Sequence, residues 1–242
     1  MYKIPFEFGN LLACFFPGNK RRARVRGWVN VILFRPFIMS FVRRTYGIKP
    51  KSVRFVRQKT LNRIVCVVDE KYYVKIFRNV TVKKLQDFKF LMDFIRTYIS
   101  VEIPVIFVSK HIPMYVCEKI PGRNVREFDK NLILNNENKI VSQVKNVIQE
   151  LQKIQISQIP NNERFVFSMQ PERSVEKPCE RPHQVLAHFD MNETNFLFDD
   201  DLNLLGVIDW DTISIAQNPD TDFNIFSKHW TRYKERVQKQ DK

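Results

Sequence analysis

Two short stretches in the carboxyl-terminal part of the chain decide which fold is predicted: VLAHFDMNETN at residues 185–195 and VIDWD at residues 207–211. The first contains the spacing HxDxxxxN from His188 to Asn195, and the second places Asp209 fourteen residues after Asn195. Aspartate is disfavoured in strands and costly when buried without a partner, so an acid after a run of hydrophobic residues requires a reason. Each stretch alone is compatible with ordinary turn residues, but their order and spacing favour a functional site.

Upstream of these stretches, runs of β-branched and aromatic residues separated by turns predict a series of antiparallel strands. The strands are expected at residues 53–56, 64–68, 72–77, 105–108 and 114–117. Between the third and the fourth, apolar residues recur at steps of three and four, which predicts a helix over residues 81–98. Lys75 lies within the third strand, where a lysine considered alone is usually a solvated residue.

The second half of the chain changes to a helical pattern before the two stretches are reached. From Ile140 to Ile154, apolar residues alternate steps of four and three, which predicts an amphipathic helix. Residues 157–184 are polar and contain four prolines, so we expect an irregular excursion there. Residues 195–198 and 204–208 flank a turn of three aspartates and predict a hairpin. With 242 residues, the chain can form one large domain or two small lobes.

The glycine content excludes the common nucleotide-binding turns. After residue 60 the sequence contains only Gly122 and Gly206, and neither GxGxxG nor GxxxxGK[ST] occurs anywhere in it. A Rossmann pyrophosphate turn or a Walker-type loop therefore cannot be built from this chain. Any nucleotide must be bound in another way.

The HxDxxxxN motif, the following Asp209 and the upstream Lys75 resemble the protein-kinase-like superfamily, and most nearly its branch of aminoglycoside phosphotransferases and choline or sugar kinases. The resemblance covers roughly residues 58–226. It implies an α+β, two-lobed protein-kinase-like fold with a small antiparallel-sheet lobe and a larger, mainly helical lobe. We expect three segments: a basic, Phe-rich arm at residues 1–52, a nucleotide-binding lobe at 53–119 and a catalytic lobe at 120–242.

In this family the motif residues transfer a phosphoryl group from ATP, and the resemblance implies a role for each. Asp190 would be the catalytic base, and His188 would organise the loop. Asn195 and Asp209 would bind Mg²⁺, which prefers hard oxygen ligands. The later Asp222 resembles the family's aspartate that supports the catalytic loop.

The resemblance also implies residues that bind ATP. Lys75 would pair with the α- and β-phosphates, and Asp87 is the candidate for the carboxylate that orients it, although the family usually has Glu there. Asn62 belongs to a segment that resembles the glycine-poor phosphate loop of the aminoglycoside-kinase branch. Backbone groups of Glu118 and Ile120 would contact adenine.

The charge of the chain is concentrated at its amino-terminal end. Residues 1–60 carry 14 Lys and Arg against one acid, which gives +13, whereas the formal charge of the whole chain is +14. Residues 15–26, FFPGNKRRARVR, are similar to the opening of many bacterial lipopolysaccharide and capsule biosynthesis enzymes. The neighbouring apolar stretch at residues 28–42 is interrupted by Arg35 and Pro36, and we expect it to be too short to span a bilayer.

Two interpretations of this arm stay open. Its arginines, beside Trp28, Phe34, Phe37 and Phe41, suit an anionic inner-membrane surface through residues 20–44. Alternatively, the segment packs on the small lobe. Nucleic-acid binding is disfavoured, because no aromatic and basic RNA-binding motif accompanies the charge.

These observations predict an ATP- and Mg²⁺-dependent kinase that phosphorylates a hydroxyl, with a sugar of a bacterial cell-envelope glycan or its precursor as the acceptor. Two alternatives remain: a soluble choline, amino-alcohol or aminoglycoside kinase, and a catalytically silent kinase-like scaffold. The four cysteines are scattered without metal-ligand spacing, which suits the cytoplasm. We therefore expect a cytoplasmic protein, either free or peripheral on the inner membrane.

Overall fold

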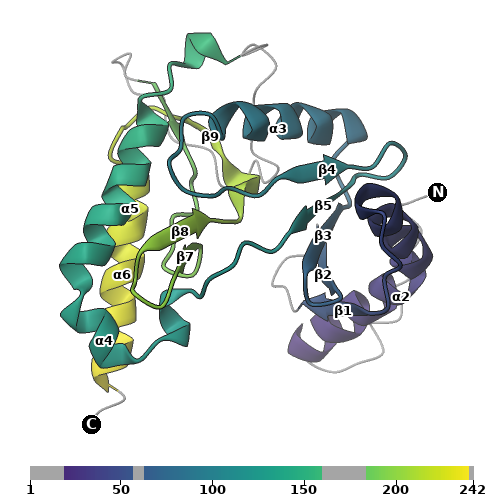
Figure 1. The fold of residues 1–242 in the computed structure, drawn as a ribbon, viewed down its shortest axis with the longest axis horizontal. Coiled ribbons are helices and arrows are strands. Elements are labelled where there is room, and N and C mark those ends of the chain that lie inside the picture. Colours follow the sequence, from purple (N-terminus) through teal and green to yellow (C-terminus); the bar gives the residue numbers. More distant parts are fainter. Residues whose placement is uncertain (1–18, 57–62, 160–183, 240–242) are drawn as a thin grey trace. The chain divides into compact units, whose positions relative to one another are not determined.

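The computed structural model of the chain describes residues 19–56, 63–159 and 184–239 (Figure 1). The described residues fall into two compact units. The first contains those up to Lys89 together with Val105–Lys119, and the second contains Phe90–Pro104 and those from Ile120 onwards. The division between the two units falls within helix α3 (Val82–Ile95), after Lys89. A first unit built around an antiparallel sheet and a mainly helical second unit confirm the predicted α+β class.

An antiparallel sheet of five strands forms the first unit, in the order β1-β2-β3-β5-β4. The predicted strand positions are confirmed to within one or two residues. In the centre of the sheet, Lys75 of β3 pairs with Val65 on one side and with Tyr115 on the other. The strands are β1 (Val53–Val56), β2 (Arg63–Val68), β3 (Tyr72–Phe77), β4 (Ile106–Val108) and β5 (Met114–Glu118).

Helix α2 (Asn19–Tyr46) packs on one face of this sheet, as one of the two interpretations of the arm predicts. Its buried residues, which include Phe34, Ile38 and Val42, share a hydrophobic core with Cys66 and Val74 of the sheet. The burial of these side chains stabilises a helix that is otherwise basic and carries a proline. Burial also raises the pKa of the Cys66 thiol to about 12, so this cysteine is an inert core residue.

The structure corrects two expectations about this segment. The helix continues through Pro36 for 28 residues, so Val25–Tyr46 is long and apolar enough to cross a membrane by length and composition, and 44% of its apolar window is buried within the structure. One proline removes only one backbone donor, and the packing against the sheet offsets this loss. Phe34 and Phe41, expected to face a membrane, are buried in the core instead.

The opposite face of the sheet carries Lys75. Side chains alternate across a strand, so Tyr73, Lys75 and Phe77 lie on the side away from α2. On this side the ring of Phe88, from α3, lies 6.0 Å from the ring of Tyr115. Helix α3 therefore contacts the sheet beside the strand that carries the predicted nucleotide-binding lysine.

In the second unit, helices pack against two short antiparallel ribbons, β6 with β9 and β7 with β8. Helix α5 contacts β6, β8 and α6. The β7–β8 hairpin agrees with the prediction, whereas β6, β9 and the long α6 were not predicted. The elements are η1 (Val125–Glu127), α4 (Lys130–Asn135), α5 (Glu137–Gln152), η2 (Ile156–Gln158), β6 (Val185–Ala187), β7 (Phe196–Phe198), β8 (Leu204–Val207), η5 (Trp210–Thr212), β9 (Ser214–Ala216) and α6 (Thr221–Lys239).

Aromatic side chains of α6 pack against one another, and polar groups beside them connect α6 to α5. The Trp230 ring stacks on Phe226 at 5.6 Å between centroids and lies 5.5 Å from Tyr233. The indole N–H of Trp230 and the ammonium of Lys234 both donate to Glu137 at the start of α5, at 2.8 and 2.7 Å. Bonding to Lys234 lowers the pKa of Glu137. Trp230 and Tyr233 are thus core residues of the second unit.

Gly206 of β8 allows the segment around Glu102 to approach the hairpin closely. The N–H of Glu102 donates to Leu205 O at 2.8 Å, and the N–H of Val207 donates to Glu102 O at 2.9 Å. A Cβ on Gly206 would lie 2.8 Å from Glu102 O and 2.9 Å from a methyl group of Ile120. Any side chain at this position must therefore displace backbone.

We predict that Gly206→Ala lowers the free energy of unfolding by about 1–3 kcal/mol, because the added methyl overpacks this contact. Denaturant titration of the variant against the parent protein measures the change. The exposed Gln149→Ala on α5 is the control and should change stability by less than about 0.5 kcal/mol. A Gly206→Ala variant as stable as the parent would show that the contact relaxes without cost.

Candidate active site

The buried carboxylate of Asp222 holds the start of the HxDxxxxN loop. It lies in the first turn of α6, is 1% exposed, and accepts the backbone N–H of His188 at 2.7 Å and of Phe189 at 2.9 Å. Hydrogen bonds to an ionised acceptor are stronger than neutral ones, and these two satisfy both carboxylate oxygens. The loop that follows β6 is thereby attached to α6.

Phe189 has a backbone conformation that glycine adopts more readily than other residues. Its φ of 62° lies in the left-handed region, which costs a residue other than glycine about 1–2 kcal/mol. The side chain is 8% exposed and packs with Ala187 and Ala216. The burial of the ring and the bond from its N–H to Asp222 offset this strain, so the turn forms without glycine.

His188 connects the loop to the strand that precedes Asp209. Its Nδ1 accepts the backbone N–H of Asp190 at 3.2 Å, so its Nε2 carries the proton and donates to Ile208 O at 3.1 Å. The ring is buried and meets Trp210 edge-on, 4.6 Å between centroids. His188 therefore lies behind the loop, bonded to Asp190 and Ile208, and its role in catalysis stays a prediction.

Asn195 makes the second connection to Ile208. Its side-chain N–H donates to Asp190 O at 2.7 Å, and its backbone carbonyl accepts the N–H of Ile208 at 2.9 Å. Ile208 thus bonds to His188 and Asn195 at once, and the next residue is Asp209. Asp209 has a φ of 65° and a ψ of 46°, a second left-handed residue that ends the strand and begins η5. Strained residues of this kind concentrate at functional sites.

The donor set at this position fits magnesium. The amide nitrogen of Asn195 donates to Asp190 O, so its oxygen is the atom that would bind a metal, and Asp209 directly follows Ile208, whose N–H bonds to the Asn195 carbonyl. Mg²⁺ commonly takes one or two protein oxygens and keeps water and phosphate in its remaining positions. Within the described ranges, no group of three or more His, Cys, Asp or Glu side chains is arranged to hold a metal ion.

Asn192 was not predicted and positions the candidate base. Its side-chain N–H lies 3.2 Å from Asp190 Oδ1 and donates to that carboxylate. Its oxygen accepts the backbone N–H of Thr194 at 3.0 Å, which fixes the orientation of the amide. Asn commonly bonds to backbone two residues away in turns. Asn192 is visible in the stretch VLAHFDMNETN, but an asparagine there is equally typical of an ordinary turn, so the sequence does not reveal its positioning role.

Glu193 is a second unpredicted residue of the loop. Its side chain is fully buried and bonds to the guanidinium of Arg126, with Nε at 3.1 Å. His229 and Arg236 of α6 each approach it to 3.6 Å. The candidate loop is therefore connected to α6 through Glu193 as well as through Asp222. The partner Arg126 lies 67 residues upstream, so the sequence alone offers no signal for this contact.

In the first unit, Lys75 and Asp87 lie on neighbouring elements. Lys75 is half-buried, with Nζ 5.7 Å from the centre of the Tyr115 ring. Asp87 is half-buried on α3, one residue before Phe88, whose ring meets the same tyrosine. The structure thus places Lys75 beside Tyr115, and Asp87 next in sequence to a residue that contacts the same ring. Their roles with phosphate stay predictions.

The remaining candidates for nucleotide binding are Glu118, Ile120 and Asn62. Glu118 ends β5 in the first unit, forms an ion pair with Lys71 at 2.6 Å, and is exposed, whereas Ile120 is buried in the second unit. Contact of their backbone groups with adenine stays a prediction. Asn62 lies outside the described residues.

Comparison with known proteins identifies the fold. The sequence matches no protein-family profile and no curated protein sequence. Solved structures do match: the GDP complex of aminoglycoside 2′-phosphotransferase-IIIa has a TM-score of 0.57 at 15% identity, covering 78% of this chain and 76% of that one. Macrolide 2′-phosphotransferase from Brachybacterium faecium gives 0.55 at 14% identity and 82% of both chains. The streptomycin–ATP complex of APH(2″)-IIa gives 0.54 at 16% identity, covering 77% and 73%.

At these identities the likeness establishes the fold. This chain has the two-lobed, protein-kinase-like fold of aminoglycoside and macrolide phosphotransferases, which confirms the fold predicted from the motif. The similarity of residues 15–26 to envelope-biosynthesis enzymes stays a prediction.

We predict that Asp222→Asn lowers the free energy of unfolding by about 2–3 kcal/mol, because the amide places an N–H against one of two buried backbone donors. Asp220→Asn is the matched control, since Asp220 is exposed two residues earlier and should be silent. Thermal and denaturant unfolding of both variants measures the difference. Equal stability of the two would show that Asp222 does not hold the loop.

Proposed function

We propose that this protein transfers the γ-phosphoryl group of ATP to a hydroxyl group of its acceptor. The observation that carries the proposal is the loop from His188 to Asn195, in which hydrogen bonds fix both the backbone and the carboxylate of Asp190. Such a loop occurs here in the fold of solved phosphotransferases. Phosphoryl transfer depends on positioning and charge stabilisation more than on covalent catalysis, and a rigid loop suits this requirement.

Asp190 is the proposed base. Asp190 is partly exposed, and Asn192 orients its carboxylate through Oδ1. The carboxylate accepts the proton of the acceptor hydroxyl as the hydroxyl oxygen bonds to the γ-phosphorus and the bond to the ADP oxygen breaks. His188 keeps the backbone of Asp190 in place, because its Nδ1 accepts the Asp190 N–H.

The other candidates bind the nucleotide. Asn195 and Asp209 would hold Mg²⁺, which when bound neutralises charge on the triphosphate. Lys75 pairs with the α- and β-phosphates, and Asp87 orients it. Glu118 and Ile120 contribute backbone groups to adenine binding.

We predict that Asp190→Asn lowers kcat by about 10²- to 10⁴-fold, because the amide cannot accept the proton, while ATP binding is largely retained. Steady-state kinetics and ATP titration separate the two effects. The control is Asp201→Asn, an exposed aspartate in the same unit. Turnover close to that of the parent protein would exclude Asp190 as the base, and absence of ATP turnover in the parent would favour the silent scaffold.

Two acceptor classes remain, and different observations favour them. The envelope-glycan acceptor rests on the predicted resemblance of residues 15–26, FFPGNKRRARVR, to lipopolysaccharide and capsule enzymes. An aminoglycoside acceptor is supported by the fold, since similar structures are complexes with streptomycin, kanamycin and gentamicin. We propose a sugar hydroxyl of an envelope glycan as the first candidate and an aminoglycoside as the second.

Mass spectrometry distinguishes the acceptors. We expect envelope glycans from cells that lack the gene to have lost a phosphate, and we expect the purified protein to restore it with ATP. Kanamycin and gentamicin are tested in the same assay and should stay unmodified. Phosphorylation of the antibiotics with unchanged glycans would reverse the assignment.

A further inference from the structure

The face of α2 that points away from the sheet is strongly apolar. Packing against the sheet accounts for the burial of Val31, Phe34, Ile38, Phe41 and Val42. On the other side, Trp28 is 62% exposed, Phe37 54%, Ile32 47% and Leu33 38%. Among the residues that the structure describes, nine large hydrophobic side chains are exposed, and these four are on one helix. Contiguous exposed apolar surface marks an interaction site.

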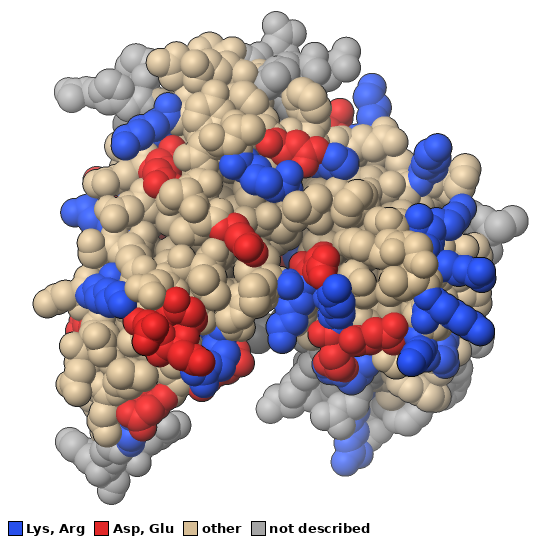
Figure 2. Space-filling model, in the orientation of Figure 1, with Lys and Arg blue, Asp and Glu red and all other residues tan. Residues whose placement is uncertain are grey.

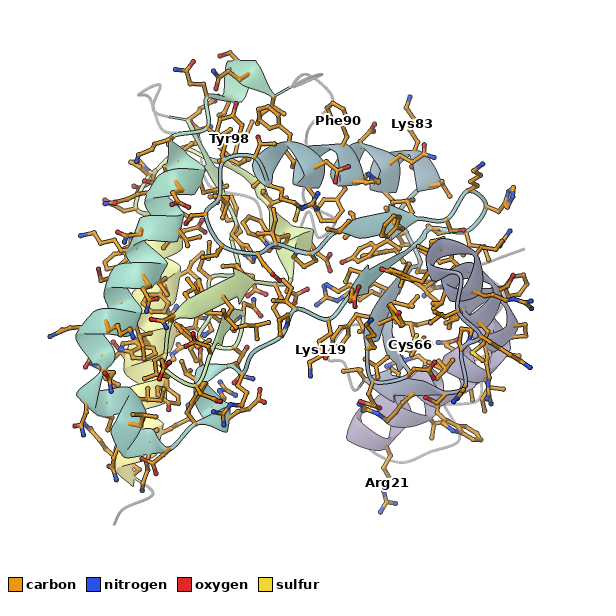
Figure 3. The ribbon with its side chains drawn as sticks, viewed as in Figure 1. Arg21, Cys66, Lys83, Phe90, Tyr98 and Lys119 are labelled. Atoms are coloured by element: carbon orange, nitrogen blue, oxygen red, sulfur yellow. The ribbon has the colours of Figure 1, made fainter. Side chains whose placement is uncertain are left out.

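Basic residues accompany this apolar surface. Asn19–Tyr46 contains no acid, and its eight basic residues stand before, within and after the apolar segment. Figure 2 shows Lys and Arg side chains along the edge of the first unit formed by α2. Figure 3 shows Arg21 pointing away from the sheet at the start of the helix. Of the arginines in α2 whose side chains the structure describes, four are exposed: Arg21, Arg35, Arg43 and Arg44.

We propose that the outer face of α2, formed by Trp28, Ile32, Leu33, Phe37 and these four arginines, docks on an anionic lipid surface with the helix parallel to the bilayer. Arginines complement anionic headgroups, and tryptophan favours the boundary between headgroups and acyl chains. A helix with aromatic and aliphatic side chains on one face and basic residues beside them is typical of interfacial binding. This inference does not depend on the proposed activity.

The structure argues against two other arrangements. A spanning helix would expose Phe34, Ile38 and Val42 to lipid and remove them from the core of the first unit. A second copy docked through the same face would bring two sets of arginines together without intervening acids, and like charges at an interface are repulsive. An anionic bilayer offers both an apolar interior for the hydrophobic side chains and negatively charged headgroups for the arginines.

The first experiment measures binding of the full-length protein to phosphatidylcholine vesicles with and without phosphatidylglycerol. We expect binding only to vesicles that contain phosphatidylglycerol. The double variant Trp28→Ser/Phe37→Ser should bind at least about tenfold more weakly, because it removes the two most exposed anchors. The control, Phe90→Ser/Leu132→Ser, removes exposed apolar side chains from the second unit and should bind like the parent.

Charge is tested with a matched pair of variants. Arg43→Gln/Arg44→Gln should weaken vesicle binding and reduce its sensitivity to salt. Lys228→Gln/Arg232→Gln removes the same charge from exposed positions of α6 and should have little effect. Unchanged thermal unfolding of each variant confirms that it is folded.

Tryptophan fluorescence locates the contact. Trp28 is exposed, whereas Trp210 and Trp230 are buried, so a blue shift on vesicle addition and quenching by brominated lipid report Trp28. Failure of the parent to bind anionic vesicles, or equal binding by Trp28→Ser/Phe37→Ser, overturns the proposal. Sedimentation that shows a dimer dispersed by the same variant would instead assign the face to a second copy.

Discussion

The candidate site depends on one interaction, the acceptance of two backbone N–H groups by the buried carboxylate of Asp222. These donors belong to His188 and Phe189, the two residues that lead into Asp190. Without an acceptor, each buried N–H would cost about 1–3 kcal/mol, and the left-handed conformation of Phe189 would lack its compensating bond. The helix α6 therefore supports the loop through its first turn, and Glu193 adds a second connection to the same helix.

A second constraint fixes the candidate ligand residues relative to the loop. Ile208 donates its N–H to Asn195 and accepts from His188, so the position of Asp209 is determined by the residue before it. The left-handed conformation of Asp209 then turns the chain into η5. Local strain at Phe189 and Asp209 is balanced by hydrogen bonds and burial in the surrounding structure, an arrangement that keeps side chains oriented in advance of ligand binding.

The two faces of helix α2 have different surroundings: one packs in the core of the first unit and the other is exposed. Its inner residues complete the core of the first unit, which explains why a helix with Pro36 and eight basic residues is stable. Its outer residues are not needed for this core. Hydrophobicity alone does not distinguish the inner residues from the outer ones. Phe34 and Phe37 are equivalent in the sequence, but in the structure Phe34 is buried and Phe37 is exposed.

Local sequence patterns were enough to predict the strands of the sheet, one hairpin and the candidate loop. Alternation predicted the strands of the sheet and the β7–β8 hairpin, and the spacing of His188, Asp190, Asn195 and Asp209 predicted the loop, because these features depend on residues close together in the chain. Tertiary structure decided the pairing of β6 with β9, the burial of Glu193 against Arg126, and the two faces of α2. Each of these depends on contacts between residues far apart in sequence, whose partners no local periodicity specifies.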